Sequence, residues 1–395
     1  MEKTEIYLDN SATTRVYPEV ANLMCKIMTE DYGNPSSMHT KGVEAEKYVL
    51  EAYKTIADVL KVKEKEIVFT SGGTESDNLA LIGGAMANKR AGMHIITTKV
   101  EHPAILNTVA YLKDEGFEID YLSVDKFGRI SIDELKEKLR KDTIIVSIMH
   151  TNNEVGSLMP LEEAGKLIKS VNPACLFHVD AVQGFGKAVM PIKSANIDML
   201  SFSGHKIHGP KGIGVLYVNE KVKIKPISYG GGQQKGLRNG TLNVPGIAGI
   251  GLAAKMINDN LSEKREKLYE LKSFFLQEIS KVDKVSINGC KKDENGEFLV
   301  KETAPHIINI SVKGLRSEVM LHALEEKNIY VSAGSACSSH SKKESSTLKA
   351  MGATPDETDG ALRISMSEFT TKKELETLIV ELKAVIEKYG RFIRK

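Results

Sequence analysis

The stretch DMLSFSGHKIHGPKGIGVLYV, residues 198–218, contains two short apolar runs joined by a turn rich in glycine and histidine. The runs cover residues 198–203 and 214–218, which is too short for helices and typical of buried strands. Similar runs precede them in the chain, at residues 66–70, 94–99, 118–124, 143–150 and 176–180. The pattern therefore predicts a sheet of seven strands.

Amphipathic helical patterns lie between several of these runs. They cover residues 75–88, 103–115, 132–139 and 161–169. The third of them follows Ser131, and Glu134 completes a capping box at its start. Strands that alternate with helices form a largely parallel sheet that is covered on both faces. We expect an α/β fold with a mostly parallel, seven-stranded sheet flanked by helices.

The pattern changes after residue 220. Residues 229–241 are polar and rich in glycine, which predicts a loop, and residues 246–281 carry one long helical pattern. Five further elements are predicted after residue 281. They are a charged, solvent-exposed loop at 290–303, a strand at 307–312, a helix at 317–327, a loop at 332–343 and a helix at 371–392.

These changes suggest two domains. The large domain is expected to cover residues 15–255. A smaller α+β domain is expected to consist of residues 1–14 and 256–395 and to carry the loop at about 332–346.

Composition excludes several classes of protein. The 395 residues are 41% hydrophobic and 27% charged, which is ordinary for a soluble globular chain, and the net charge of +2 favours neither nucleic acid nor an anionic membrane. The N-terminus lacks the apolar core of a signal peptide, and the longest uncharged stretch, 240–254, is too short to span a bilayer. We expect a cytoplasmic protein without a membrane segment.

The four cysteines, Cys25, Cys175, Cys290 and Cys337, lie far apart and form no C-x-x-C pair. This spacing disfavours both a disulfide framework and a zinc site. Cys337 lies in SAGSACSSHS, residues 332–341, where small polar residues surround it. An exposed thiol near histidine and lysine has the character of a nucleophile, and a metal site with His340 lacks further ligands.

Two charged residues stand where predicted strands end. Lys206 lies in the turn after residues 198–203, where desolvation can turn a lysine into a reactive amine, although an ordinary loop lysine is solvated. Asp180 ends an apolar strand, and a buried carboxylate needs a cationic partner such as a pyridinium nitrogen. Alternatively, Asp180 caps a turn.

Further polar residues follow other predicted strands. Residues 70–78, TSGGTESDN, connect a strand to a helix, which favours phosphate binding but is not a Walker loop. His102 precedes a helix and either stacks on a planar cofactor or caps the helix. The amides of residues 152–153 suit a carboxylate or a phenolic oxygen. Arg363, within an apolar run, needs a carboxylate from the protein or from a substrate.

Residues 249–254, GIGLAA, look like a dinucleotide-binding fingerprint. Pro245 precedes them where that motif requires a strand, and a helical pattern occupies the place of the second strand. A Rossmann domain is therefore excluded.

Taken together, these segments resemble the cysteine desulfurases of the NifS and IscS type, fold-type I enzymes of the class V aminotransferase superfamily. The resemblance extends in order from residues 6–14, IYLDNSATT, to residues 363–365, RIS. Residues 69–78, 150–156, 201–214 and 334–337 are specific to this group when taken jointly.

The resemblance implies pyridoxal 5′-phosphate as cofactor and a role for each matching residue. Lys206 would form the Schiff base and move protons, Asp180 would pair with the pyridinium nitrogen, and His102 would stack on the ring. Gln183 would bind the phenolic oxygen. The residues implied to hold the phosphate are Gly73, Thr74, Ser203, His205 and, from the other subunit of a homodimer, Thr241.

The resemblance also implies the reaction. Asn153 and Arg363 would bind the carboxylate of L-cysteine, and Cys337 would attack the sulfur of the cysteine–pyridoxal adduct. The products would be L-alanine and a persulfide on Cys337, whose sulfur passes to an acceptor such as an iron–sulfur scaffold protein. A transient iron–sulfur contact at Cys337 is compatible with this role, and no resident metal is expected.

Two alternatives stay open at this point. One is another class V enzyme, an aminotransferase or a selenocysteine lyase, and the other is a non-catalytic sulfur-relay protein. A loop thiol such as Cys337 is not needed by an aminotransferase, and the set Lys206, Asp180 and His102 argues against a non-catalytic protein. The sequence does not name the sulfur acceptor.

Overall fold

The computed structural model describes residues 5–333 and 345–390. Its largest sheet has seven strands in the order β2-β8-β7-β6-β5-β3-β4. The strands are β2 (Ile67–Thr70), β3 (His94–Thr98), β4 (Glu118–Leu122), β5 (Thr143–Ser147), β6 (Leu176–Asp180), β7 (Met199–Ser203) and β8 (Gly214–Val218). Each one falls within a run predicted from the sequence.

Neighbouring strands from β4 to β7 are parallel, and β8 is antiparallel to both β7 and β2. The expected mostly parallel α/β sheet is therefore confirmed. The central strands β5, β6 and β7 are buried along their whole length. Such burial explains why their sequences are nearly continuous apolar runs and do not alternate.

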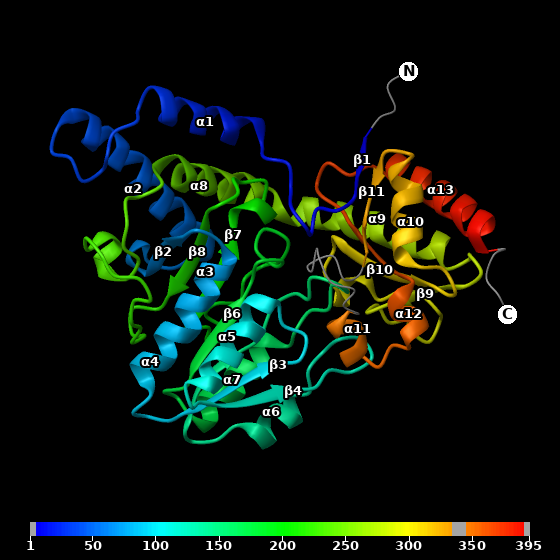
Figure 1. Cartoon of the computed structure of the whole chain (residues 1–395), viewed down its shortest axis with the longest axis horizontal. Coiled ribbons are helices and arrows are strands. Elements are labelled where there is room, and N and C mark those ends of the chain that lie inside the picture. The colour runs from blue at the N-terminus through cyan, green and yellow to red at the C-terminus, as the bar shows by residue number, and fades with distance from the viewer. Residues whose placement is uncertain (1–4, 334–344, 391–395) are drawn as a thin grey trace.

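Helices lie on both sides of this sheet (Figure 1). They are α1 (Pro18–Thr29), α2 (Thr40–Leu60), α3 (Gly73–Asn78), α4 (Gly84–Asn88), α5 (Pro103–Asp114), α6 (Ile132–Lys138), α7 (Leu161–Val171) and α8 (Val244–Asn258). A π-helical turn, Leu79–Gly83, joins α3 to α4, so the predicted helix at 75–88 is one continuous helical stretch with a local bulge.

A second group of elements packs around a four-stranded sheet of order β12-β13-β10-β9. Its strands are β9 (Val285–Asn288), β10 (Ile307–Val312), β12 (Ser332–Ala333) and β13 (Ala361–Ser365). Its helices are α9 (Leu261–Ile279), α10 (Ser317–Glu325), α11 (Ser346–Ala350), α12 (Pro355–Asp359) and α13 (Lys372–Gly390). Helix α13 starts with a capping box, because Thr371 and Glu374 exchange hydrogen bonds.

The N-terminal strand β1 (Ile6–Tyr7) lies beside this second group and pairs in parallel with β11 (Ile329–Tyr330). Leu8 continues into the same apolar cluster as Phe275, Ile310 and Leu378. A separate, larger cluster fills the space between the seven-stranded sheet and its helices. The division at residues 14–15 and 255–256 stays a prediction.

The prediction of one long helix at 246–281 is wrong. The structure has two helices, α8 and α9, separated at Asp259 and Asn260. Asp259 is extended and Asn260 has a φ of 55°, in the left-handed region that asparagine tolerates better than most residues. The sequence Asn-Asp-Asn at 258–260 was the signal for this break.

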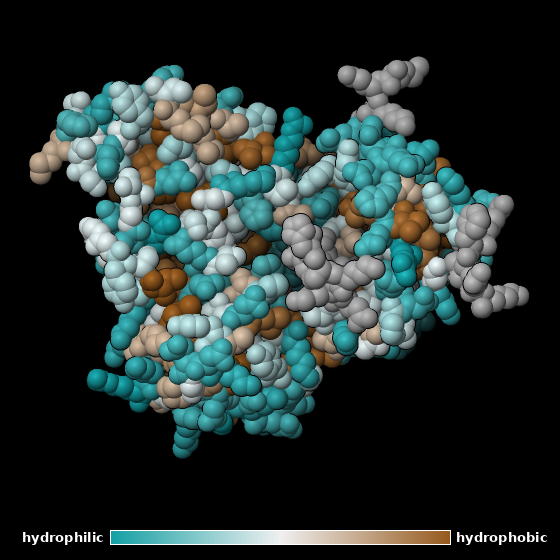
Figure 2. Space-filling view, in the orientation of Figure 1, coloured by the Kyte–Doolittle hydropathy of each residue, from teal (hydrophilic) through white to brown (hydrophobic). Residues whose placement is uncertain are grey.

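None of the helices in the described ranges is long and apolar enough to cross a membrane. On the face drawn in Figure 2, hydrophilic side chains are the most abundant, and apolar ones form separate patches among them.

Candidate active site

A cavity of about 270 Å³ opens where the carboxyl ends of several strands of the large sheet meet. Asp180 ends β6, Ser203 ends β7, and His102 and Asn153 follow β3 and β5. This edge of a parallel sheet is the usual position of a ligand site in α/β proteins. Ser11 and Arg363 line the cavity from the side of the second group of elements.

Apart from Thr241 and Cys337, every site residue predicted from the sequence lines this cavity. The residues concerned are Gly73, Thr74, His102, Asn153, Asp180, Gln183, Ser203, His205, Lys206 and Arg363. Thr241 is exposed in the segment before α8 and does not line the cavity. Cys337 lies outside the residues that the structure describes.

Lys206 lies in a 3-10 turn, Gly204–Lys206, directly after β7. Its Nζ donates hydrogen bonds to the main-chain oxygen of Ser11 and to that of Ala12, the latter at 2.7 Å. Two carbonyl oxygens thus hold the amine at the cavity wall, where it is only partly exposed.

Asp180 is buried at the end of β6, and its Oδ1 accepts a hydrogen bond from the Val182 main chain at 2.9 Å. Burial raises the pKa of this carboxyl group, whereas that hydrogen bond and the nearby His102 and Lys206 lower it. A carboxylate in such a place is suited to a cationic ring nitrogen.

His102 caps helix α5, since its Nδ1 accepts a hydrogen bond from the Ala104 main chain at 3.1 Å. Both roles considered for this residue are thus compatible, because the capping ring also lines the cavity. Burial lowers the pKa of His102, so the ring is neutral at pH 7 and carries its proton on Nε2.

Small and hydroxyl-bearing residues form one end of the cavity. A Cβ atom added at Gly73 would lie 2.7 Å from Cγ2 of Val182, so a larger residue at the start of α3 would force Val182 to move. Thr74 and Ser203 stand beside Gly73. Burial, with help from Lys206, lowers the pKa of His205 to about 4, which leaves a neutral ring that can donate one hydrogen bond.

Gln183 is oriented by partners on two sides. Its Nε2 donates to the Ser11 main-chain oxygen at 2.9 Å, and its Oε1 lies 3.4 Å from Nε2 of His306. His306 is buried, and burial holds its pKa well below the usual value, so the ring is neutral.

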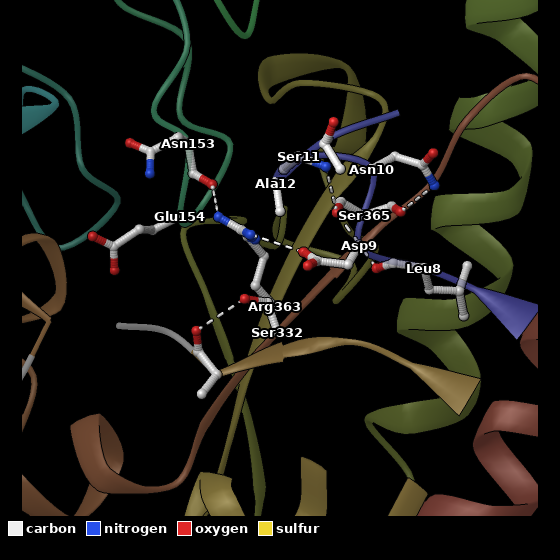
Figure 3. A network of polar contacts seen from close by, with 12 residues as sticks. Leu8, Asp9, Asn10, Ser11, Ala12, Asn153, Glu154, Ser332, Arg363 and Ser365 are labelled. Atoms are coloured by element: carbon white, nitrogen blue, oxygen red, sulfur yellow. Dashed lines mark hydrogen bonds and ion pairs between the residues drawn. The ribbon is translucent and has the colours of Figure 1, made fainter. Parts of the chain in front are cut away.

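Arg363 extends from β13 toward the cavity between two other segments (Figure 3). Its Nη2 forms an ion pair with Oδ1 of Asp9 at 2.9 Å, and its Nη1 donates to the Asn153 main-chain oxygen at 3.1 Å. The sequence required a carboxylate partner for this arginine, and the protein supplies one.

The sequence analysis assigned no role to five other lining residues, namely Ser11, Asp77, Met149, Thr151 and Val182. Asp77 is the most notable, because burial and the nearby Asp180 raise its pKa well above the usual value. Its Oδ1 lies 3.6 Å from Nε2 of His178. The sequence contains a signal that Asp77 lies at the site, since this residue belongs to the same Gly-rich segment as Gly73 and Thr74.

The residues present fit pyridoxal 5′-phosphate. A lysine amine suits its aldehyde, the buried Asp180 suits its ring nitrogen, and the narrow glycine end with its hydroxyl groups suits its phosphate.

The chain is similar to several known proteins. The model of the family "Aminotransferase class-V" matches residues 6–378. The chain is 40% identical to "Cysteine desulfurase IscS" of Methanosarcina thermophila, covering 98% of this chain and 93% of that protein. It is 42% identical to "Putative cysteine desulfurase IscS 1" of Bacillus subtilis (strain 168), covering 97% and 99%.

Among solved structures, one described as "NIFS-LIKE PROTEIN" matches with a TM-score of 0.90 and 35% identity, covering 98% of this chain and all of that one. The chain therefore belongs to the class V aminotransferase family, and its cofactor is pyridoxal 5′-phosphate. Within that family it falls among the cysteine desulfurases of the NifS and IscS type.

Proposed function

We propose that this protein removes sulfur from L-cysteine, releases L-alanine and retains the sulfur as a persulfide on Cys337. The observation that carries the proposal is the cavity itself, in which Lys206, Asp180 and Arg363 face one space. The amine and the carboxylate suit pyridoxal phosphate, and the guanidinium group suits the carboxylate of an amino-acid substrate.

When bound, pyridoxal phosphate supplies an electron sink for the bonds at the substrate's Cα and Cβ atoms. The chain's own residues hold and orient it: Lys206 through the aldehyde, Asp180 through the ring nitrogen and His102 against the ring. Gln183 has a second N–H available for the phenolic oxygen, since its carbonyl oxygen faces His306. Gly73, Thr74, Ser203 and His205 are the residues that would hold the phosphate.

Arg363 and Asn153 orient the substrate through its carboxylate. Lys206 is the group positioned to take the proton from the substrate's Cα and to return a proton when L-alanine forms. The neutral imidazole of His102 is available to assist this transfer through Nε2. Asp180 is buried and His102 is half-buried, which limits the access of bulk water to these groups.

The sulfur step uses the thiolate of Cys337. Its Sγ forms a bond to the sulfur of the substrate while the substrate's Cβ–S bond breaks, and the electron pair of that bond stays with the carbon fragment. The fragment takes up a proton and leaves as L-alanine. One cysteine is converted to one alanine and one persulfide, so no external oxidant or reductant is needed.

The finer features of this function are also proposals. We place the enzyme in the cytoplasm as a homodimer in which Thr241 reaches the phosphate of the other subunit. The exposure of Thr241 supports this, as does the bidentate ion pair of Arg238 with Glu75 (2.8 Å), which holds the same segment against α3. The persulfide would pass to an acceptor protein, with an iron–sulfur scaffold as the first candidate.

The variant Cys337→Ser tests the proposal. We expect it to bind the cofactor normally but to release no sulfide from L-cysteine, and wild-type Cys337 should gain the mass of one sulfur atom after a single turnover. The exposed Cys25 provides the matched control, since Cys25→Ser should leave both measurements unchanged. Full sulfide release by Cys337→Ser would refute the persulfide role and would favour a lyase that needs no loop thiol, such as a selenocysteine lyase.

A further inference from the structure

The guanidinium group of Arg363 is buried, with only 4% of its side chain exposed. Two of its nitrogens are engaged, Nη2 by Asp9 and Nη1 by the main chain of Asn153, and its Nε has no hydrogen-bond partner within the described ranges. An arginine with a buried, unpartnered N–H that lines a cavity can accept one more anionic group.

Asp9 reaches Arg363 from 354 residues away in the chain. The main chain on both sides of Asp9 is fixed to β13, because Leu8 accepts from the Ser365 main chain at 2.7 Å and Asn10 donates to it at 3.2 Å. Ser11 adds a bond to Oγ of Ser365 at 2.8 Å. The main chain that carries Asp9 is therefore held in place by these contacts and does not depend on Arg363 for its position.

The segment that carries Asp9 also contacts the other charged end of the cavity. Two residues after Asp9, the main-chain oxygen of Ser11 accepts from Lys206, and that of Ala12 does so as well. Figure 3 shows this segment beside Arg363. Because it is bound both to β13 and to Lys206, the segment sets where Asp9 stands relative to the cavity.

Within the described ranges, a second carboxyl group close to Arg363 belongs to Glu154. Burial raises its pKa, the charge of Arg363 lowers it, and it accepts a hydrogen bond from Oγ of Ser345. Asp9 is thus the carboxylate that pairs directly with the guanidinium group, and it neutralises a charge that would be costly to bury alone.

We propose that Asp9 is a positioning residue that sets the strength of carboxylate binding at Arg363. It holds the guanidinium group in one orientation and weakens its attraction for the substrate's carboxylate, so that L-alanine can leave. The inference rests on the proposed function, in which Arg363 binds that carboxylate. A carboxylate that approaches Arg363 meets an already neutralised cation and is repelled by Asp9.

The variant Asp9→Asn removes the negative charge but keeps the size of the side chain and an oxygen that can face Nη2. Titrating the holoenzyme with L-alanine, by calorimetry and by the absorbance of the bound cofactor, should show a dissociation constant lowered roughly tenfold. L-alaninamide, which has no carboxylate, should bind wild type and Asp9→Asn equally. Asp9→Glu, which keeps the charge, should stay closer to wild type than Asp9→Asn.

The surface pair of Arg140 with Asp142, also at 2.9 Å, provides the matched control. Asp142→Asn should leave L-alanine binding unchanged. An unchanged or raised dissociation constant in Asp9→Asn, with cofactor absorbance and melting temperature intact, would overturn the inference. If Asp9→Asn does not fold, Asp9→Ser also removes the charge and is expected to give the same gain.

Arg363→Gln separates this inference from the proposed function. If Arg363→Gln binds L-alanine as wild type does, the carboxylate role of Arg363 is wrong and the proposed substrate site fails. If Arg363→Gln weakens binding but neither Asp9→Asn nor Asp9→Ser strengthens it, only the role of Asp9 fails.

Discussion

The side-chain amide of Gln183 donates a hydrogen bond to the main-chain oxygen of Ser11 at 2.9 Å, across 172 residues of sequence. His306 faces the other end of the same amide, with 3.4 Å between its Nε2 and Oε1 of Gln183. Two fixed partners therefore determine which end of the amide presents an N–H to the cavity. Sequence alone could place Gln183 after a strand but could not show this orientation.

Gln183→Glu tests whether that N–H matters. Glutamate would place an oxygen against the Ser11 carbonyl and would remove the donor for the cofactor's phenolic oxygen. We expect cofactor affinity to fall roughly ten- to a hundredfold, as for a lost hydrogen bond with an unpaired buried group. Equilibrium dialysis with pyridoxal phosphate measures this. Gln277, which donates to Glu297 on the surface, provides the control as Gln277→Glu, and unchanged affinity in Gln183→Glu would contradict the assignment.

Asp180→Asn tests the carboxylate at the end of β6. Asparagine keeps the acceptor for the Val182 main chain but removes the charge that would hold the ring nitrogen protonated. We expect kcat for sulfide release to fall on the order of 10²- to 10³-fold, as when a preorganised electrostatic partner is removed. The cofactor should remain bound, which its absorbance reports. Asp120 lies in β4, away from the cavity, and its side chain is 42% exposed. The same loss in the control Asp120→Asn would show that the effect is not specific to the site.

Much of this architecture follows from residue patterns along the chain. Strands β5, β6 and β7 are buried on both faces, so their apolar runs are visible in the sequence. Asp180 and Ser203 end such strands, and parallel strands bring their carboxyl ends to one edge, so these residues could be expected to meet.

Other features depend on contacts that no local pattern encodes. Asp9 meets Arg363 because β1 pairs with β11 and the segment after β1 bridges to β13 at Ser365. The break between α8 and α9 is hard to predict because the helical periodicity continues on both sides of it. Only two residues, the extended Asp259 and Asn260 with its positive φ, separate the helices.

Gly165 in α7 gives a prediction about stability. A Cβ atom at this position would lie 1.7 Å from the main-chain oxygen of Ala195, which backbone packing holds in place. Gly165→Ala should destabilise the protein by about 1–3 kcal/mol through overpacking, although alanine is the better helix former. Urea unfolding measures the change, and the exposed neighbour as Lys166→Ala should stay within about 0.5 kcal/mol of wild type. A higher free energy of unfolding in Gly165→Ala than in wild type would show that α7 and the main chain at Ala195 can move apart at little cost.

The lowered pKa of the buried His150 predicts how the stability of the protein depends on pH. The ring is buried against Gly184, and its Nδ1 lies 2.7 Å from Oγ1 of Thr151. Burial, followed by the charge of Arg265, lowers the pKa of His150 from 6.5 to about 4. The unfolded chain therefore binds a proton more readily than the folded one between these values.

The stabilisation from neutral His150 is complete above pH 6.5 and is lost as the pH falls toward 4, which amounts to a change on the order of 3 kcal/mol. We expect the melting temperature of the holoenzyme to fall across this range and to fall less steeply in His150→Asn. The exposed His322, which pairs with Glu325 on the surface, provides the control, since His322→Asn should keep the wild-type slope. Equal slopes in wild type and His150→Asn would mean that the buried ring takes up its proton without loss of the fold.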